Sequence, residues 1–102
     1  MNKNQEGALI SVLLDVTARD DERDDAAMDL SRYGSNETIE ALIRVANDEN
    51  NPEIVRASCG ESLAEIWLRK NEFTVKELLR LKGGANKEAT AFLQAKKPEW
   101  LK

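Results

Sequence analysis

The side chains that could do chemistry in this sequence are concentrated in one acidic segment, Asp20-Asp21-Glu22-Arg23-Asp24-Asp25. Oxygen-bearing side chains at alternate positions 20, 22 and 24 are how a calcium-binding loop begins. The rest of such a loop is missing, because Asp25 stands where the loop needs Gly and Ser31 stands where it needs Glu. We therefore expect no metal site, and we interpret the carboxylates as the start of a helix, whose positive N-terminal end they stabilise.

The other groups used in catalysis are scarce. The chain has no His, so it lacks the commonest general base, the usual activator of a Ser or Cys nucleophile and the commonest zinc ligand. The single Cys59 falls in an apolar stripe and is expected to be a small buried side chain. Gly83-Gly84 lacks the Lys-Ser/Thr of a phosphate-binding loop and is interpreted as a helix stop. We predict a protein that is not an enzyme and uses no cofactor, metal or small-molecule substrate.

The elements that must position these side chains are helices. An apolar stripe at i, i+3, i+4 and i+7 indicates a first helix: Ile39, Leu42, Ile43 and Ala46. After a polar turn at 47–51, a second stripe follows: Val55, Cys59, Leu63, Ile66 and Trp67. Asn36 is predicted to cap the first helix, and Asn51 the second, with Pro52 at its first position. Small residues at 58, 60, 62 and 64 should let another helix approach closely.

Looser copies of this helical hairpin flank it. Arg23, Ala26 and Leu30 lie 33 residues before Arg56, Cys59 and Leu63, a repeat period typical of stacked helix pairs. Residues 5–16 carry an apolar stripe so wide that we expect burial against more than one neighbour. A capping-box pattern at 74–77 opens a third pair. We predict an all-α chain of three antiparallel hairpins, at about 5–34, 36–70 and 74–97, which form a single domain over residues 1–102.

One hairpin carries a family resemblance. A polar Asp/Asn-rich turn, then Pro52, Val55-Arg56 and a helix of small residues resembles a HEAT repeat, especially the short bacterial kind. The resemblance implies that the hairpins stack as a short HEAT-like right-handed superhelix. It also implies that Asp48 and Arg56 tie neighbouring repeats together. The last repeat is expected to be degenerate, because the end of such a stack must be soluble.

The charges are divided unevenly along the chain. Residues 1–65 hold 15 acidic and 6 basic side chains, a net charge of −9, and residues 66–102 hold 4 and 9, a net charge of +5. In HEAT-like stacks the second helices line one face, which here would be mostly acidic with an apolar tip. Such a face repels nucleic acid and attracts a cationic protein. The predicted partner-binding residues are Asp20, Asp21, Asp24, Asp25, Met28, Arg32, Glu61 and Glu65. The alternative is that these charges only solvate helix faces.

Two functions of different class fit this architecture. In size, charge and helical build the chain is similar to bacterial immunity proteins, which bind a toxin domain and cover its active site. That resemblance implies a basic toxin or nuclease domain as the protein partner. The alternative is a HEAT-like adaptor or scaffold subunit with no inhibitory role. It would contact its partner through an exposed end of the stack, and that partner could be a second copy of the chain in a stacked homo-oligomer.

A third class is a nucleic-acid binder that uses the basic last third of the chain. Its residues would be Arg69, Lys70, Lys76, Arg80 and Lys82. We interpret them instead as helix caps and solvated faces, so no direct contact with nucleic acid is expected.

The sequence also bears on location. No apolar run approaches the ~18 residues that a membrane span requires, so no membrane association is expected. Residues 9–14 are apolar but lack the basic approach and cleavage site of a signal peptide. A single Cys is typical of a reducing compartment, and we expect a cytoplasmic protein.

Overall fold

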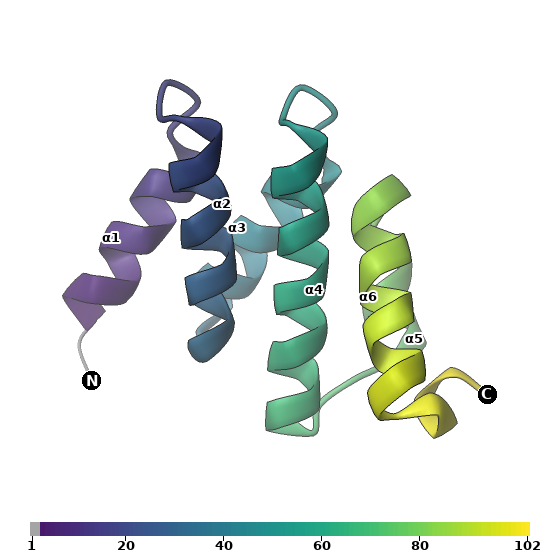
Figure 1. The fold of residues 1–102 in the computed structure, drawn as a ribbon. Helices are drawn as coiled ribbons and strands as arrows, with labels where there is room; N and C mark the ends of the chain where they lie inside the picture. The colour runs from purple at the N-terminus through teal and green to yellow at the C-terminus, as the bar shows by residue number, and fades with distance from the viewer. Residues whose placement is uncertain (1–2) are drawn as a thin grey trace.

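In the computed structural model, which describes residues 3–102, every regular element is helical (Figure 1). The prediction of an all-α chain is therefore confirmed over that range. Two short 3-10 helices follow α2 and α6. The bounds are α1 Lys3–Leu14, α2 Asp20–Asp29, η1 Leu30–Arg32, α3 Asn36–Asn47, α4 Glu53–Lys70, α5 Val75–Leu79, α6 Gly83–Lys96 and η2 Pro98–Leu101.

The helices form two layers. In the front layer of Figure 1, α2, α4 and α6 lie side by side and run in the same direction, with α2 and α6 on opposite flanks of α4. Behind them, α1 contacts α2 and α3, α3 contacts α4, and α5 contacts α6. Because the front helices run in parallel, their N-terminal ends gather at one edge of the layer and their C-terminal ends at the other. Their dipoles therefore point the same way.

The core lies where the apolar stripes of the two layers meet. The predicted stripe of α4 is buried along its whole length, from Val55 at 0% exposure to Trp67 at 4%. In α3 the stripe is buried except at Ile39, which is half-buried. In α1, by contrast, only Leu13 is fully buried, and Leu14 is 37% exposed. Helix α1 does pack against more than one neighbour, as expected, because it contacts α2, α3 and η1, but its stripe is less buried than those of α3 and α4.

Small side chains bring neighbours close to α4 on both flanks. On one flank, a Cβ added at Gly60 would collide with the backbone carbonyl group of Ala85 in α6. On the other flank, the Ser62 hydroxyl donates to the carbonyl oxygen of Ala27 in α2 at 2.7 Å. The prediction that small residues permit a close approach is confirmed. Because each small side chain leaves room for backbone, α4 is held firmly in the middle of the front layer.

The structure corrects two predicted helix starts. The cap of α3 is Ser35 rather than Asn36, since the Ser35 hydroxyl accepts from the backbone N–H of Thr38 at 3.1 Å. The cap of α4 is Pro52 rather than Asn51. The side chain of Asn51 is thereby left to hydrogen-bond elsewhere, and it is used between helix pairs.

The glycine pair at 83–84 begins a helix instead of ending one. Helix α5 already stops at Leu79, and α6 starts at Gly83, whose φ of +55° lies in the left-handed region. The interpretation of the pair as a helix stop is therefore wrong. The glycine supplies the backbone conformation with which the chain enters α6.

Aromatic rings close the C-terminal end of the molecule. Phe73, in the segment between α4 and α5, stacks on Trp100 with ring centroids 5.0 Å apart, and it also contacts Trp67 at 5.4 Å. Lys97 places its Nζ over the Trp100 ring, 5.2 Å from the centroid. The terminal Trp therefore folds back on the chain, and the aromatic stack covers apolar surface at this end.

Replacing Gly60 by Ala tests the close approach of α4 and α6. We expect the free energy of unfolding to fall by about 2–3 kcal/mol, at the upper end of overpacking costs, because the added methyl meets backbone that cannot turn away. The matched control is Gly7→Ala in α1, where an added Cβ meets no atom within 4 Å. There Ala should stabilise the helix by up to about 1 kcal/mol. Urea unfolding followed by circular dichroism measures both, and equal effects of the two changes would contradict the close approach.

Candidate protein-binding surface

Helix α2 is the main source of exposed negative charge. Six of its ten residues carry carboxylates: Asp20, Asp21, Glu22, Asp24, Asp25 and Asp29. Its one cation, Arg23, is only 3% exposed. Every charged side chain that α2 presents to solvent is therefore negative, which produces a strong local field.

Arg23 points inward and joins three segments. Its Nε donates to the carbonyl oxygen of Leu13 at the end of α1, at 3.0 Å. Its Nη2 donates to the Oδ1 of Asn51 at 2.9 Å, and the Nδ2 of Asn51 donates to the carbonyl oxygen of Val45 at 3.1 Å. A buried guanidinium is tolerated when it is hydrogen-bonded in this way. The contact fixes the α1–α2 pair against the turn between α3 and α4.

The residues predicted to tie repeats together make local contacts. Arg56 donates from Nε to the carbonyl oxygen of Asn51 at 3.0 Å, and Asp48 accepts from the backbone N–H of Asn50 at 3.0 Å. Both bonds stay within the α3–α4 pair. Arg23 and Asn51 instead form one of the hydrogen bonds that link α2 to the turn between α3 and α4. Arg23 aligns with Arg56 at an offset of 33 residues, but it was not among the residues predicted to tie repeats together.

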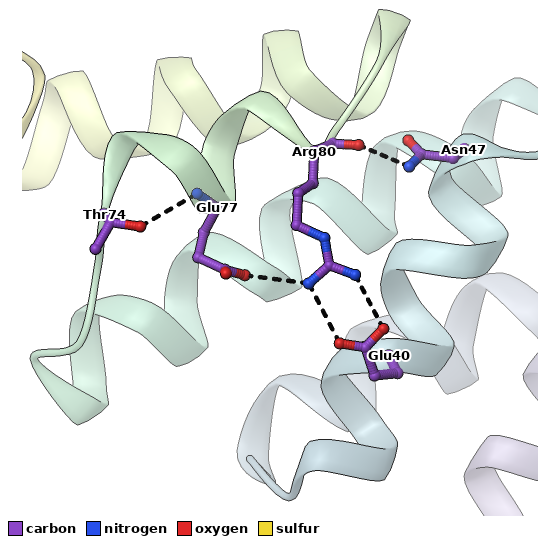
Figure 2. A network of polar contacts seen from close by, with 5 residues as sticks. All are labelled: Glu40, Asn47, Thr74, Glu77 and Arg80. Carbon is purple, nitrogen blue, oxygen red and sulfur yellow. Dashed lines mark hydrogen bonds and ion pairs between the residues drawn. The ribbon is translucent and has the colours of Figure 1, made fainter.

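A second polar network joins α3 to the turn before α6 (Figure 2). The guanidinium of Arg80 donates to both carboxylate oxygens of Glu40, at 3.0 and 3.3 Å, and lies 3.5 Å from Glu77. The Nδ2 of Asn47 donates to the carbonyl oxygen of Arg80 at 2.7 Å, and its Oδ1 accepts from the N–H of Lys82 at 3.1 Å. The hydrogen bond with Glu40 raises the pKa of Arg80. The turn at 47–51 therefore forms hydrogen bonds with α2 through Asn51 and with the segment between α5 and α6 through Asn47.

The basic residues near the C-terminal end of α4 are engaged with backbone. Arg69 donates to the carbonyl oxygens of Ser31 and Tyr33, and Lys70 donates to that of Gly34 at 3.0 Å. These carbonyls end the α2–η1 segment, where a cation offsets the negative helix end. Together with Arg80, three of the five residues considered for nucleic-acid binding are thus occupied in contacts within the chain.

The predicted partner-binding residues fall into separate places. Asp20, Asp25 and Glu61 are exposed, and Met28 is 46% exposed. Asp21 is exposed but forms an ion pair at 3.0 Å with Arg19, whose hydrogen bond lowers the pKa of Asp21. Of the set, Asp24 is partly buried. Its Oδ1 accepts from the Ser58 hydroxyl at 2.5 Å, which ties it to α4.

Arg32 and Glu65 lie in a hollow whose lining is basic. This hollow, of about 550 Å³, lies where the C-terminal ends of the front helices meet. It is lined by Ser31, Arg32, Glu65, Leu68, Arg69, Phe92 and Lys96. Three cations face one carboxylate there, so the face expected to be mostly acidic is acidic around α2 and basic at this end. Sequence patterning missed this because it considered only residues of the first two helix pairs.

A groove that the sequence did not indicate runs between α1 and α2. It has a volume of about 500 Å³ and is lined by Leu9, Val12, Asp15, Thr17, Ala18, Glu22, Asp25, Ala26 and Asp29. Four of these side chains are carboxylates and none is a cation. Hydrogen bonds from the Thr17 hydroxyl and N–H lower the pKa of Asp15, which keeps it ionised. Among the predicted partner-binding residues, only Asp25 lines this groove.

Nucleophilic and metal chemistry find little support in the described residues. Cys59 is fully buried, and burial raises the pKa of its thiol to about 12. A neutral thiol without access to solvent is a poor nucleophile and a poor metal ligand. Within residues 3–102, no three Cys, Asp or Glu side chains are grouped so that they would hold a metal ion. Cys59 is a packing residue between α4 and its neighbours.

Comparisons with protein-family models, with curated proteins and with solved structures find no match to this chain. None of the helices in the described range is long and apolar enough to cross a lipid bilayer.

Replacing Asn51 by Ala tests the contact between helix pairs. We expect a loss of about 2–3 kcal/mol in the free energy of unfolding, because the buried Arg23 guanidinium loses a hydrogen bond of the charged kind. The control is the adjacent Asn50→Ala, an exposed position that should change stability by less than about 0.5 kcal/mol. Urea unfolding measures both variants. Similar stability of N51A and N50A would show that Arg23 does not depend on Asn51.

The buried thiol of Cys59 should be protected in the native state. We expect no reaction with Ellman's reagent at mildly alkaline pH in buffer, and stoichiometric reaction after unfolding in urea. Because the unfolded thiol loses its proton at lower pH than the folded one, this group should also lower the free energy of unfolding as the pH rises above about 9. Native labelling at the rate of free glutathione would contradict the burial of Cys59.

Proposed function

We propose that this chain is a non-catalytic protein-binding module, an immunity protein that binds and neutralises a cognate bacterial toxin in the cytoplasm. The observation that supports this most strongly is the charge of α2. Five of its six carboxylates are exposed and Asp24 is partly buried, while its only cation, Arg23, is buried. The helix dipole accounts for Asp20, Asp21 and Glu22 in the first turn, but it does not account for Asp24, Asp25 and Asp29 further along α2.

The proposed partner is a basic domain, such as a nuclease toxin. A nuclease active site is positive because its substrate is a polyanion, so an acidic helix is complementary to it. Charges of opposite sign raise the rate of association between two proteins and make that rate depend on salt concentration. The proposed contact residues on the face of α2 and α4 are Asp20, Asp21, Asp25, Met28 and Glu61.

We further propose that the three helix pairs form a short HEAT-like right-handed stack. The parallel run of α2, α4 and α6 and the contacts between successive pairs support that arrangement. In such a stack each pair buries its apolar face only with the help of its neighbours. The acidic helix α2 then stands at one end of the stack, with a side free for a partner.

The alternative proposal is an adaptor or scaffold subunit that inhibits nothing. It is favoured by the exposed apolar side chains on α5, where Val75 is 48% and Leu79 is 72% exposed. Helix α5, which carries both residues, lies beside α6 on the other side of α4 from α2 (Figure 1). Exposed apolar residues at an end of a helical stack are suited to a second protein contact.

Expression of the open reading frame beside the gene separates the two proposals. An immunity protein should have a toxin-bearing neighbour that arrests growth when expressed alone and is harmless when this chain is co-expressed. A neighbour that is harmless alone, with no toxin in the pair, would overturn the inhibitor proposal and favour the adaptor.

The contact itself is tested by the rate of association with the purified toxin domain across a salt series. The triple variant Asp20→Asn, Asp21→Asn, Glu61→Gln should associate about tenfold more slowly at low salt, because the steering field is weakened. The control is Glu72→Gln, Glu88→Gln, Glu99→Gln, which removes the same net charge from the basic third of the chain. An association rate that is indifferent to salt, or equal losses in both triples, would contradict an acidic contact face.

A further inference from the structure

The groove between α1 and α2 lies at the edge of the front layer, where the row of parallel helices ends. Helix α4 has a front-layer helix on each flank, α2 and α6, whereas α2 has one, α4, and its other main contact is with α1 of the back layer. Figure 1 shows α1 and α2 at the N-terminal edge of the molecule, with no further described helix beyond them. The groove occupies the position that one more helix would take against this edge.

The groove has an apolar floor and an acidic rim. Leu9, Val12 and Ala26 form the floor, and the two residues from α1 are only half-buried. The carboxylates of Asp15, Glu22, Asp25 and Asp29 surround it. Burial of this apolar floor under an apolar side chain of a partner would be favourable. The acidic rim would attract a cation of the partner at the edge of the contact.

The rim carries charge at a cost to the fold. Glu22, Asp25 and Asp29 follow one another at i, i+3 and i+7 on α2, a spacing at which like charges repel along a helix. Asp29 also lies in the last turn, where the helix dipole disfavours an anion. Among residues 3–102, Asp25 and Asp29 have no ion pair or side-chain hydrogen bond that offsets this. A soluble edge requires polar side chains, but it does not require a single sign.

We propose that the groove between α1 and α2 binds an amphipathic helix of the protein partner that carries Lys or Arg on both sides of an apolar stripe. The inference rests on the proposed function and specifies which part of the acidic surface holds the partner. The line from Glu22 to Asp29 is about 10 Å long at 1.5 Å per residue. Cations at i, i+3 or i+4, and i+7 of the bound helix match that line, and its apolar stripe covers Leu9 and Val12.

The experiment uses a fluorescein-labelled peptide of about 18 residues, long enough to be helical, made of Leu and Lys at amphipathic spacing. A peptide of the same composition in scrambled order is the ligand control. The protein variant is Glu22→Gln, Asp25→Asn, Asp29→Asn, in which the new amide at position 22 can still accept the capping-box hydrogen bond. The matched protein control is again Glu72→Gln, Glu88→Gln, Glu99→Gln. Binding is measured by fluorescence anisotropy, and melting temperature by circular dichroism.

The wild-type chain should bind the amphipathic peptide at least about tenfold more tightly than the scrambled one, and the groove variant should lose at least about tenfold in affinity. The control variant should bind like the wild type. The groove variant should melt no lower than the wild type, because like charges have been removed. Amide resonances of Val12, Thr17 and Ala26 should shift on titration with the peptide.

Four results would overturn the inference. Equal losses in the groove and control variants would mean that only net charge matters. Equal binding of both peptides would mean that no helix is recognised. A concentration-dependent dimer that the groove variant abolishes would mean that a second copy of this chain occupies the groove. If the groove variant still protects cells from the toxin while the Asp20, Asp21, Glu61 variant does not, the proposed function stands and the groove is not its contact.

Discussion

The guanidinium of Arg23 is withdrawn from solvent between the first two helix pairs, where Leu13 and Asn51 accept its hydrogen bonds. A buried charge is stable only where its surroundings are fixed, so this contact requires α1, α2 and the α3–α4 turn to be in place together. The burial of Arg23 also determines the charge of the surface of α2. Because Arg23 is buried, every charged side chain that α2 presents to solvent is a carboxylate, and this edge of the molecule is acidic.

The position of α4 depends on the small side chains along its two flanks. Gly60 admits the backbone of α6, and Ser62 reaches the backbone of α2, so both neighbours lie close and run parallel to it. Parallel helices bring their C-terminal ends together, and the cations that suit those ends collect there. Arg69 and Lys70 are bonded to the end of the preceding front helix. The molecule is therefore acidic along its first edge and basic where the helices end.

These features relate the proposed contact to the stability of the fold. The carboxylates along the α1–α2 groove repel one another, and none of them takes part in the hydrogen bonds between Arg23 and Asn51 or between Arg80 and Glu40. The repulsion among these carboxylates therefore acts on helices whose positions are fixed by hydrogen bonds in the interior. The repulsion between like charges on a surface decreases when a partner of opposite charge covers that surface.

The all-α class, the apolar stripes of α3 and α4 and the charge split were determined by the sequence, because each follows from periodicity and composition within one segment. The small residues of α4 likewise predicted the close approach of another helix, but not that a neighbour lies on each side. The tertiary structure alone decided that Asn47 and Asn51 join neighbouring pairs, that Arg32 and Glu65 share a basic hollow, and that α1 leaves an acidic groove open. A polar residue in a turn carries no sign of what lies opposite it. Its partner is set by the packing of segments about 30 residues apart, which local patterns do not encode.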